Sequence, residues 1–473
     1  MSNQVDNLAG NRCQSLIGPA GCGKTETIAQ ALKIAEGRQL ILTHTHAGVR
    51  SLQQKFKKLK IPPSKYVLET IHGFFLKYAA SYPTMSGLSF STNKNDIWSK
   101  IIPAFTSLLE TKFIKQVLQC SYDGVFVDEY QDCTLSQHNA ILKMCEYLPV
   151  RVLGDPLQGI FDFNPMDQIV EWRRDVLPNF PQLDELQTPW RWDGKNKKLS
   201  QWITSLRENI QAGQPINLDQ PKGVITWKQL NHKDINQERL LSSQCISAVP
   251  TDQTFVAIEQ YPNEAHKFAR CQGGRLQSME EMACNELFKT LIKFENHQSS
   301  ELVLEVVRFI KKCTVMNGYL EDVERQSNNK KYNFLKIDNS TIREIIRSIF
   351  YTHEYSSIAQ LIDFTLLTKG KDVFRQELMK EMSKSLKEFC NCGFDSISDA
   401  AWEVRSRTRE RGQNIPRMIV SRTLLIKGLE FDNTLVLNAD NIQNEKLFYV
   451  SMTRACHSLT VFSESPIIKF ESK

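Results

Sequence analysis

One stretch near the start of the chain has the residue types and spacing that bind a polyphosphate. Residues 18–25 read GPAGCGKT and fit the pattern G-x-x-x-x-G-K-[ST] without a mismatch, between apolar residues ending at Ile17 and a helix-like run over 26–35. Lys24 is expected to reach the terminal phosphates, and the Thr25 hydroxyl to bind Mg²⁺. The glycines that let backbone N–H groups face the phosphates are Gly18, Gly21 and Gly23. The stretch therefore predicts a nucleotide site, with a chance glycine turn as the alternative.

A second stretch supplies carboxylates. The apolar residues 125–127 stop abruptly at Asp128 and Glu129. Ligands of an open α/β sheet gather at the carboxyl ends of its strands, so both side chains should lie at the lip of a site. A surface turn after a core strand would leave the same pattern. Beside residues 18–25, however, Asp128 becomes a predicted Mg²⁺ ligand and Glu129 the base for an attacking water.

Composition sets limits on the class of protein. A chain of 473 residues, with 41% hydrophobic and 24% charged residues, suggests two to four soluble globular domains. No apolar run is long enough to span a bilayer, and the polar start lacks a signal core, so we expect a cytoplasmic location without membrane contact. The twelve cysteines are then reduced thiols rather than a disulfide framework. The net charge of +6 is compatible with a polyanionic partner without demonstrating one.

Strands alternating with helices predict a mostly parallel sheet over much of the first 180 residues. A small helical insertion is expected at 81–119, with helices around 97–102 and 105–118. Residues 279–411 have helical periodicity, with a loop at 324–331. The chain is expected to return to a sheet at 419–425, 434–437 and 459–462.

Eight motifs appear in a characteristic order. Residues 18–25, 43–46, 70–72, 128–132 and 154–161, followed by 186–191, 427–431 and 449–455, resemble the motifs of superfamily 1 helicases of the UvrD, Rep and PcrA type. The resemblance implies an α/β fold with two RecA-like P-loop domains with parallel sheets, plus two helical insertions. The implied ranges are 1–80 and 120–180 for domain 1A, 81–119 for a 1B-like insertion, 181–278 and 412–473 for domain 2A, and 279–411 for a 2B-like insertion.

The resemblance also implies residue roles around ATP. Gln158 would sense the γ-phosphate, and Arg191 and Arg454 would reach it from the second RecA-like domain. Their positive charge suits a loose phosphoryl transition state. Without the family, both arginines would be ordinary surface cations. Glu430 would approach the ribose, and Gln4 is the candidate adenine reader.

The implied DNA contacts come from four motifs. His44, Thr70 and His72 lie in the motifs that touch the strand, although His44 stands where the family usually has Phe. Phe161 and Phe163 occupy the positions of aromatic residues that stack on bases. Two core phenylalanines at strand spacing are the alternative. The opening of the 427–431 motif also departs from the family pattern, which weakens the usual DNA contacts there.

Taken together, the sequence predicts an ATP-dependent DNA helicase or translocase that acts on single-stranded DNA or DNA junctions, with implied 3′ to 5′ movement, in DNA repair or anti-phage defence. The short insertions make the layout similar to the helicase-like subunit of the Gabija anti-phage system, which works beside a nuclease partner. The alternative is therefore a DNA-sensing ATPase, a regulatory subunit of a nuclease complex that unwinds little alone.

Overall fold

The structure is a computed structural model and describes residues 2–10, 12–88, 94–161, 166–220, 222–231, 234–281, 284–315, 319–328, 334, 337, 339–411 and 415–470. It divides into two compact units. The first comprises Met1–Ile216, Gln443–His457 and Lys469–Lys473, and the second Asn217–Ile442 and Ser458–Ile468. The finer domain boundaries expected from the sequence stay predictions.

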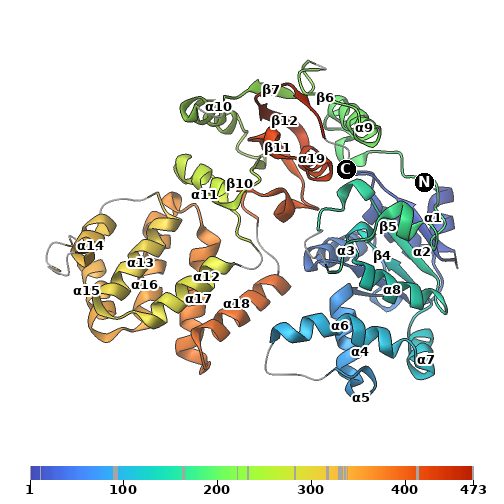
Figure 1. Ribbon diagram of the computed structural model, residues 1–473, viewed down its shortest axis with the longest axis horizontal. Coiled ribbons are helices and arrows are strands. Elements are labelled where there is room, and N and C mark those ends of the chain that lie inside the picture. The colour runs from blue at the N-terminus through green and yellow to red at the C-terminus, as the bar shows by residue number, and fades with distance from the viewer. Residues whose placement is uncertain are drawn as a thin grey trace. The chain divides into compact units, whose positions relative to one another are not determined.

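The first unit is built on a five-stranded sheet of order β1-β5-β4-β2-β3, in which every neighbouring pair is parallel (Figure 1). Its strands are β1 (Gln14–Ile17), β2 (Gln39–Thr43), β3 (Tyr66–Thr70), β4 (Gly124–Val127) and β5 (Val150–Gly154). Because parallel strands share one direction, the residues that follow β1, β4 and β5 meet at one edge. This order confirms the predicted parallel sheet and positions the site.

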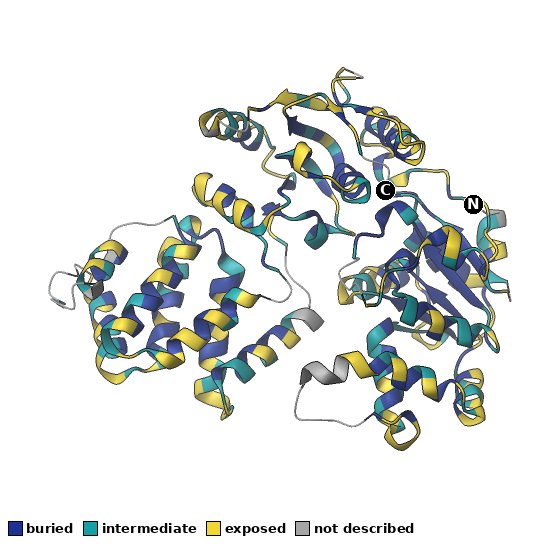
Figure 2. Ribbon diagram, viewed as in Figure 1, coloured by how far each residue is buried: buried dark blue, intermediate teal, exposed yellow. Residues whose placement is uncertain are grey.

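Helices cover this sheet and bury its strands, as Figure 2 shows in dark blue. They are α1 (Ser2–Ala9), α2 (Lys24–Ile34), α3 (His46–Lys58), α4 (Ile71–Ser81) and α8 (Leu135–Cys145). The first unit also contains α9 (Lys197–Gln211) and α19 (Glu445–Met452). The apolar side chains on α2, such as Ile28 and Leu32, are fully buried and pack against β1 and β4 residues. Burial of this kind contributes roughly 1.5–3 kcal/mol per large side chain.

Three further helices fall in the range of the predicted small insertion: α5 (Pro83–Ser86), α6 (Lys94–Leu108) and α7 (Lys112–Ser121). The expected break between 102 and 105 was wrong, because α6 continues through Pro103. Ile101 and Phe105 on either side of the proline are fully buried, and Phe105 stacks on Phe75 of α4 at 4.2 Å. This packing offsets the backbone hydrogen bond that proline removes.

The second unit contains a six-stranded sheet of order β7-β12-β11-β8-β10-β9. Its strands are β7 (Thr226–Gln229), β8 (Phe255–Ile258), β9 (Gln277–Ser278), β10 (Met418–Ser421), β11 (Phe431–Val436) and β12 (Ala455–Ser463), with helices α10 (Ile235–Ser247) and α11 (Pro262–Cys271). The pairs of β8 with β10 and β11, of β9 with β10 and of β7 with β12 are parallel. The remaining strands are β6 (Ile216–Asn217) and β13 (Ile467–Ile468).

The strand expected over 419–425 was too long. β10 ends at Ser421, which pairs with Ile258, the last residue of β8. A short 3₁₀ helix follows over Thr423–Ile426. The strand ends there because its partner also ends, and an unpaired extension would leave backbone groups without hydrogen bonds.

In the described part of this unit, helices α12 to α18 form an all-helical body (Figure 1). They are α12 (Asn285–Asn296), α13 (Ser299–Cys313), α14 (Tyr319–Asn328), α15 (Ser340–Thr352), α16 (Tyr355–Lys369), α17 (Gln376–Cys392) and α18 (Ile397–Arg411). The prediction of a loop over 324–331 was wrong for residues 324–328, which belong to α14. Residues 329–331 lie outside the described residues. Val323 is buried and Glu324 pairs with Lys311 at 2.5 Å, and both contacts fix α14 against α13.

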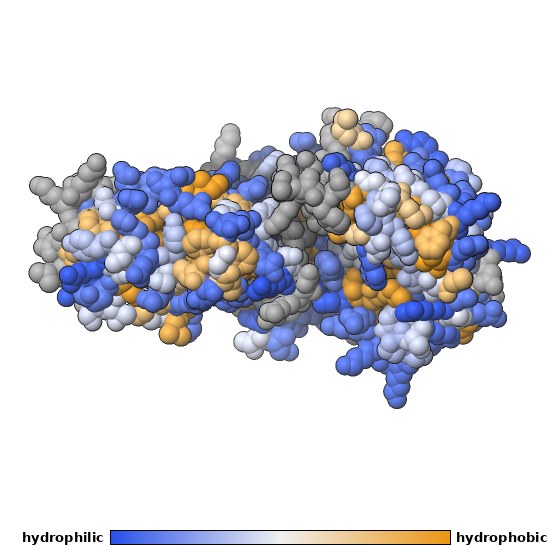
Figure 3. All heavy atoms as spheres, turned by 90° about the horizontal axis from the view of Figure 1, so that it is seen from below, coloured by the Kyte–Doolittle hydropathy of each residue, from blue (hydrophilic) through white to orange (hydrophobic). Residues whose placement is uncertain are grey.

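Among the described residues, no helix is both long enough and apolar enough to traverse a bilayer. On the face seen in Figure 3, apolar side chains form small patches between hydrophilic ones. That pattern is ordinary for a folded protein surface in water.

Candidate nucleotide site

The loop between β1 and α2 has the conformation of a phosphate-binding loop. Gly18 N donates to Gly154 O at 2.9 Å, and α2 begins at Lys24, directly after Gly23 with φ +85°. Lys24 is buried, and its Nζ donates to Gly18 O at 2.9 Å. A Cβ atom on Gly18 would lie 2.4 Å from Cγ of Lys24, so only glycine leaves room for this arrangement.

The predicted carboxylate pair follows β4. Asp128 N donates to Leu42 O at 2.8 Å, and Glu129 N donates to Asp128 Oδ1 at 3.0 Å. Glu129 adopts φ +55°, a left-handed conformation that non-glycine residues take up rarely and that clusters at functional sites. Its Oε1 lies 3.7 Å from Nζ of Lys24. The structure thus brings the loop lysine and the predicted base together.

The two carboxylates differ in their surroundings. Asp128 is buried, whereas the Glu129 side chain is 30% exposed and can reach water. Burial, and then the adjacent charge of Glu129, raise the pKa of Asp128 to about 7, although Lys24 opposes the shift. A buried carboxylate with a raised pKa is a good candidate for a functional group, here one that binds a metal cation.

Gln131 links Glu129 to the end of β5. Its Nε2 donates to Glu129 Oε2, while its Oε1 accepts a hydrogen bond from Asp155 N at 2.9 Å. Asp155 is fully buried and accepts from Gln158 Nε2 at 2.7 Å and from Arg207 Nη1 at 2.6 Å. The predicted residue Gln158 therefore lies in a hydrogen-bond network with the base.

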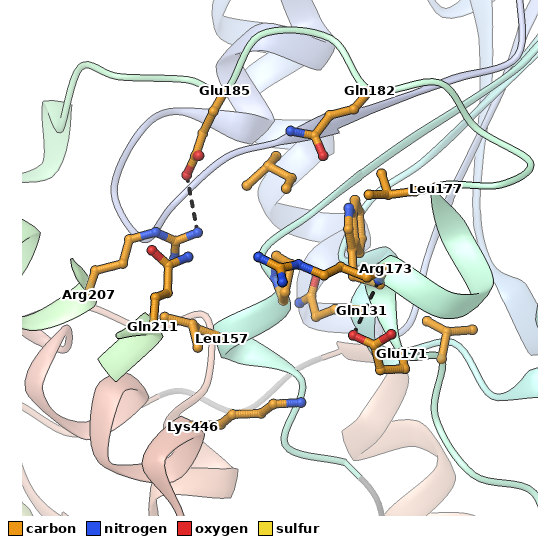
Figure 4. Close-up of a pocket in the computed structure, with 14 residues that line it drawn as sticks. Gln131, Leu157, Glu171, Arg173, Leu177, Gln182, Glu185, Arg207, Gln211 and Lys446 are labelled. Carbon is orange, nitrogen blue, oxygen red and sulfur yellow. Dashed lines mark hydrogen bonds and ion pairs between the residues drawn. The ribbon is translucent and has the colours of Figure 1, made fainter. Parts of the chain in front are cut away.

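Arg207 is a residue of the site that the sequence patterns did not predict. It comes from α9 and also donates through Nη2 to Glu185 Oε1 at 3.1 Å. Burial alone would lower the pKa of Arg207, but the charge of Asp155 raises it overall. Figure 4 shows Arg207 and Gln131 lining a cavity of about 460 Å³. No local motif marks an arginine that is 52 residues from its partner in the sequence.

Arg191 lies against the phosphate-binding loop. Its N donates to Gly21 O at 3.2 Å, and its Nη1 donates to Thr453 O at 2.5 Å. A Cβ atom on Gly21, which has φ +75°, would lie 2.7 Å from Cβ of Arg191. The adjacent Trp190 is 46% exposed, and its Cδ1 would lie 3.2 Å from a Cβ atom on Gly23. The sequence did not single out Trp190 as part of the loop's cover.

Arg454 follows α19 and belongs to the same compact unit as the loop. It is fully buried, its Nε donates to Val450 O at 2.9 Å, and its Nη2 donates to Thr453 Oγ1 at 2.9 Å. Both predicted arginines therefore contact Thr453, Arg191 through the carbonyl and Arg454 through the hydroxyl. The structure brings the two arginines to one turn.

Two further residues, Gln4 and Glu430, were predicted to contact the nucleotide. Gln4 of α1 donates through Nε2 to Asp184 O at 3.0 Å and to Glu185 O at 3.2 Å. Glu430 is exposed, lies directly before β11 and belongs to the second unit. Their proposed contacts with adenine and ribose stay predictions.

The predicted DNA-contacting residues have these positions. Thr70 caps α4 by accepting from Gly73 N at 3.0 Å. The rings of His44 and His72 are half-buried, with His44 Nε2 3.4 Å from Cys133 Sγ and His72 Nδ1 3.2 Å from Gln137 Nε2. Burial lowers the pKa of His72. Phe161 is half-buried, and Phe163 lies outside the described residues.

The residues present fit a nucleotide with Mg²⁺. The glycines leave a cradle that side chains would fill, and Lys24 faces it from the amino end of α2. Thr25 and Asp128 offer a hydroxyl and a carboxylate, the oxygen ligands that Mg²⁺ prefers. The raised pKa of Asp128 is what a nearby cation would relieve.

The fold and this loop define a P-loop nucleotide-binding protein. Residues 2–164 match the family model described as an AAA domain. No curated protein matches the chain.

Among solved structures, the chain is similar to the nonstructural protein 10 helicase of Arterivirus. In the complex with DNA, the match has 13% identity and a TM-score of 0.27, and covers 54% of this chain and 49% of the viral chain. Without DNA, the match has 10% identity and a TM-score of 0.36, and covers 98% of this chain and 62% of the viral chain. The chain thus spans less than two thirds of the viral chains.

Proposed function

We propose that this protein hydrolyses ATP and uses the reaction to move along single-stranded DNA, as a helicase or translocase with 3′ to 5′ polarity. The observation that carries the proposal is the 3.7 Å approach of Lys24 Nζ to Glu129 Oε1 at the carboxyl edge of a parallel sheet. A phosphate clamp and a solvent-accessible carboxylate at that distance are the two parts that water attack on a γ-phosphate requires.

We assign each step of ATP hydrolysis to particular residues of the chain. Backbone N–H groups of residues 18–25 and the Lys24 ammonium bind the phosphates, and Glu129 accepts a proton from the attacking water. Thr25 and Asp128 would hold Mg²⁺, which when bound supplies positive charge to the phosphate oxygens. Gln158, Arg191 and Arg454 would supply donors and positive charge to the γ-phosphate.

Gln131 is a positioning residue in this scheme. Its Nε2 donates to Glu129 Oε2, and its Oε1 accepts from the backbone N–H of Asp155. Any movement of residues 155–158 would therefore shift Gln131 and, through it, the general base Glu129. This link gives a physical route by which a strand contact at Phe161 or Phe163 could change the rate of hydrolysis.

Single-stranded DNA is the nucleic acid along which we propose the protein moves. Phe161 and Phe163 would stack on bases, while His44, Thr70 and His72 would contact the strand on the same domain. Stacking on aromatic faces tolerates any base, which suits a protein that moves along DNA without reading it. Gln4 and Glu430 would contact adenine and ribose.

The alternative is a DNA-sensing ATPase that works beside a nuclease and unwinds little alone. The small size of the α5–α7 region favours it, since only three helices are available for duplex contacts there in the described part. Strand displacement on duplexes with a 3′ or a 5′ tail separates the two. Displacement only from the 3′ tail supports the motor, and DNA-stimulated ATP turnover without displacement from either tail supports the sensor.

A further inference from the structure

Two cysteines are neighbours at the end of β1 that is remote from the phosphate-binding loop. Cys13 directly precedes β1, and Cys145 is the last residue of α8. Cys13 Sγ donates to Cys145 O at 4.0 Å and to Leu148 O at 3.7 Å, so the two cysteines are direct neighbours. Both residues are half-buried.

Cys13 has groups around it that stabilise a thiolate. Val150 N donates to Cys13 Sγ at 3.3 Å. Arg151 is buried beside it, with Nη2 bonded to Gln39 Oε1 at 2.6 Å and Nη1 to Pro149 O at 2.9 Å. Over the described ranges, no carboxylate forms an ion pair with Arg151, and its Nε has no hydrogen-bond partner. A buried guanidinium surrounded by neutral groups favours an anion nearby.

The thiol chemistry agrees with this geometry. The hydrogen bond from Cys145 lowers the pKa of Cys13 most, and the Val150 N–H and the Arg151 charge lower it further against the effect of burial, to about 6. The contact with Cys13 and burial raise the pKa of Cys145. One thiol of the pair is thus the nucleophile and the other holds its proton.

We propose that Cys13 and Cys145 form a redox-sensitive thiol pair, with Cys13 attacking a peroxide and Cys145 resolving the product as a disulfide. This inference is independent of the proposed ATPase activity.

The reaction balances with hydrogen peroxide as the oxidant. The Cys13 thiolate attacks one peroxide oxygen, the O–O bond breaks, and the departing hydroxide takes up a proton as water, leaving Cys13 as a sulfenic acid. The negative charge that held the proton on Cys145 is then gone. Cys145 sulfur attacks Cys13 sulfur, the S–O bond breaks, and a second water leaves with the Cys145 proton. Two thiols lose two electrons and two protons, and one peroxide becomes two waters.

The disulfide would join the start of β1 to the end of α8, which are far apart in the sequence. A bridge that closes so long a loop restricts the unfolded chain, so the oxidised protein should have a higher Tm. The phosphate-binding loop follows the opposite end of β1, so nucleotide binding should change little.

The test uses the full chain in which the four exposed cysteines, Cys120, Cys271, Cys390 and Cys392, are changed to serine. After treatment with hydrogen peroxide and alkylation of the remaining thiols, peptide mass spectrometry should find Cys13 linked to Cys145 with loss of two hydrogens. In the same background, Cys145→Ser should leave a sulfenic acid on Cys13 that dimedone traps. Free thiols at both positions after peroxide would overturn the proposal.

A rate measurement on the reduced protein gives a second test that needs no substitution in the pair. At neutral pH, iodoacetamide should modify Cys13 at least about tenfold faster than Cys245, a half-buried thiol whose pKa is raised by burial. Equal rates, or a faster reaction at Cys245, would contradict the assignment of Cys13 as the nucleophile.

Discussion

Nζ of Lys24 lies 3.7 Å from Oε1 of Glu129, although the two residues are 105 positions apart in the chain. The parallel order of β1, β5 and β4 produces this approach, because each strand delivers its next residue to the same edge. In the absence of nucleotide, the carboxylate compensates the buried ammonium. A phosphate that binds Lys24 would take over this role and leave Glu129 available to a water molecule.

Glu129→Gln should preserve nucleotide binding and stop turnover. The amide retains the size of the side chain and its contact with Gln131 but cannot accept a proton, and loss of a general base typically costs about 10²–10⁴-fold in rate. Binding is measured with a fluorescent ATP analogue and turnover by phosphate release. Glu36→Gln, at an exposed position after α2, is the matched control. Normal turnover by the Glu129 variant would remove this residue as the base.

Arg207→Ala should destabilise the first unit strongly. It leaves the fully buried carboxylate of Asp155 without its charged partner, which costs about 3–5 kcal/mol in free energy of unfolding. Thermal unfolding monitored by circular dichroism measures the change. The exposed Arg174, paired with Asp175, serves as the control, and Arg174→Ala should change Tm little.

A second substitution checks the cause of that loss. Arg207→Met combined with Asp155→Asn removes both charges, and Asn can still accept from Leu157 N, so the double variant should recover much of the stability. A double variant less stable than Arg207→Ala would show that the contact contributes by another route.

Asp128→Asn should stabilise the protein without Mg²⁺ and nucleotide, increasingly so as the pH rises. The pKa of Asp128 is about 7 in the folded state and about 3.9 in the unfolded state, so between these values the folded state binds more protons and loses stability with rising pH. The advantage of the variant should grow from pH 4 to 7 and level off on the order of 4 kcal/mol.

The opposite sign is expected at Asp175, whose pKa is lowered by its hydrogen bond with Arg174. Its stabilising contribution is present above the unfolded pKa and is lost as the pH falls, so Asp175→Asn should reduce stability at neutral pH. Chemical unfolding in EDTA at several pH values measures both variants. A gain for Asp128→Asn that is independent of pH would exclude ionisation as its cause.

Phe163→Ala should weaken binding of single-stranded DNA by about 1–3 kcal/mol, the usual contribution of one stacked base, while ATP turnover without DNA stays unchanged. Fluorescence anisotropy with a labelled oligonucleotide measures the affinity. Phe113→Ala on α7 controls for loss of an exposed phenylalanine elsewhere, since Phe113 is 50% exposed. Unaltered affinity in the Phe163 variant would place this side chain outside the DNA contact.

The sequence predicted the features that depend on local patterns. Residues 18–25 and 125–129 identified a loop and a strand end from spacing alone, and the structure confirms the parallel sheet that carries them. Helix ends were less predictable: Pro103 suggested a break, yet burial of Ile101 and Phe105 keeps α6 continuous. Tertiary packing outweighed the local preference there.

The contacts that complete the candidate site could not be predicted, because they join distant parts of the chain. No local motif marks the contact of Arg207 with Asp155, and the 186–191 motif, which contains Trp190, does not indicate that this side chain approaches Gly23. Thr453 accepts from Arg191 across 262 residues. The family resemblance indicated Arg191 and Arg454, but only the fold shows that both contact Thr453.

The most direct test of a DNA-dependent ATPase at this site is ATP turnover by the purified chain, measured with and without single-stranded DNA. The wild type is compared with Lys24→Ala and with a control, Lys33→Ala, which changes an exposed lysine on the same helix. We expect turnover that DNA stimulates in the wild type and in Lys33→Ala and that is absent from Lys24→Ala. Turnover that persists in Lys24→Ala, or that DNA leaves unchanged in the wild type, would contradict a DNA-dependent ATPase at this site.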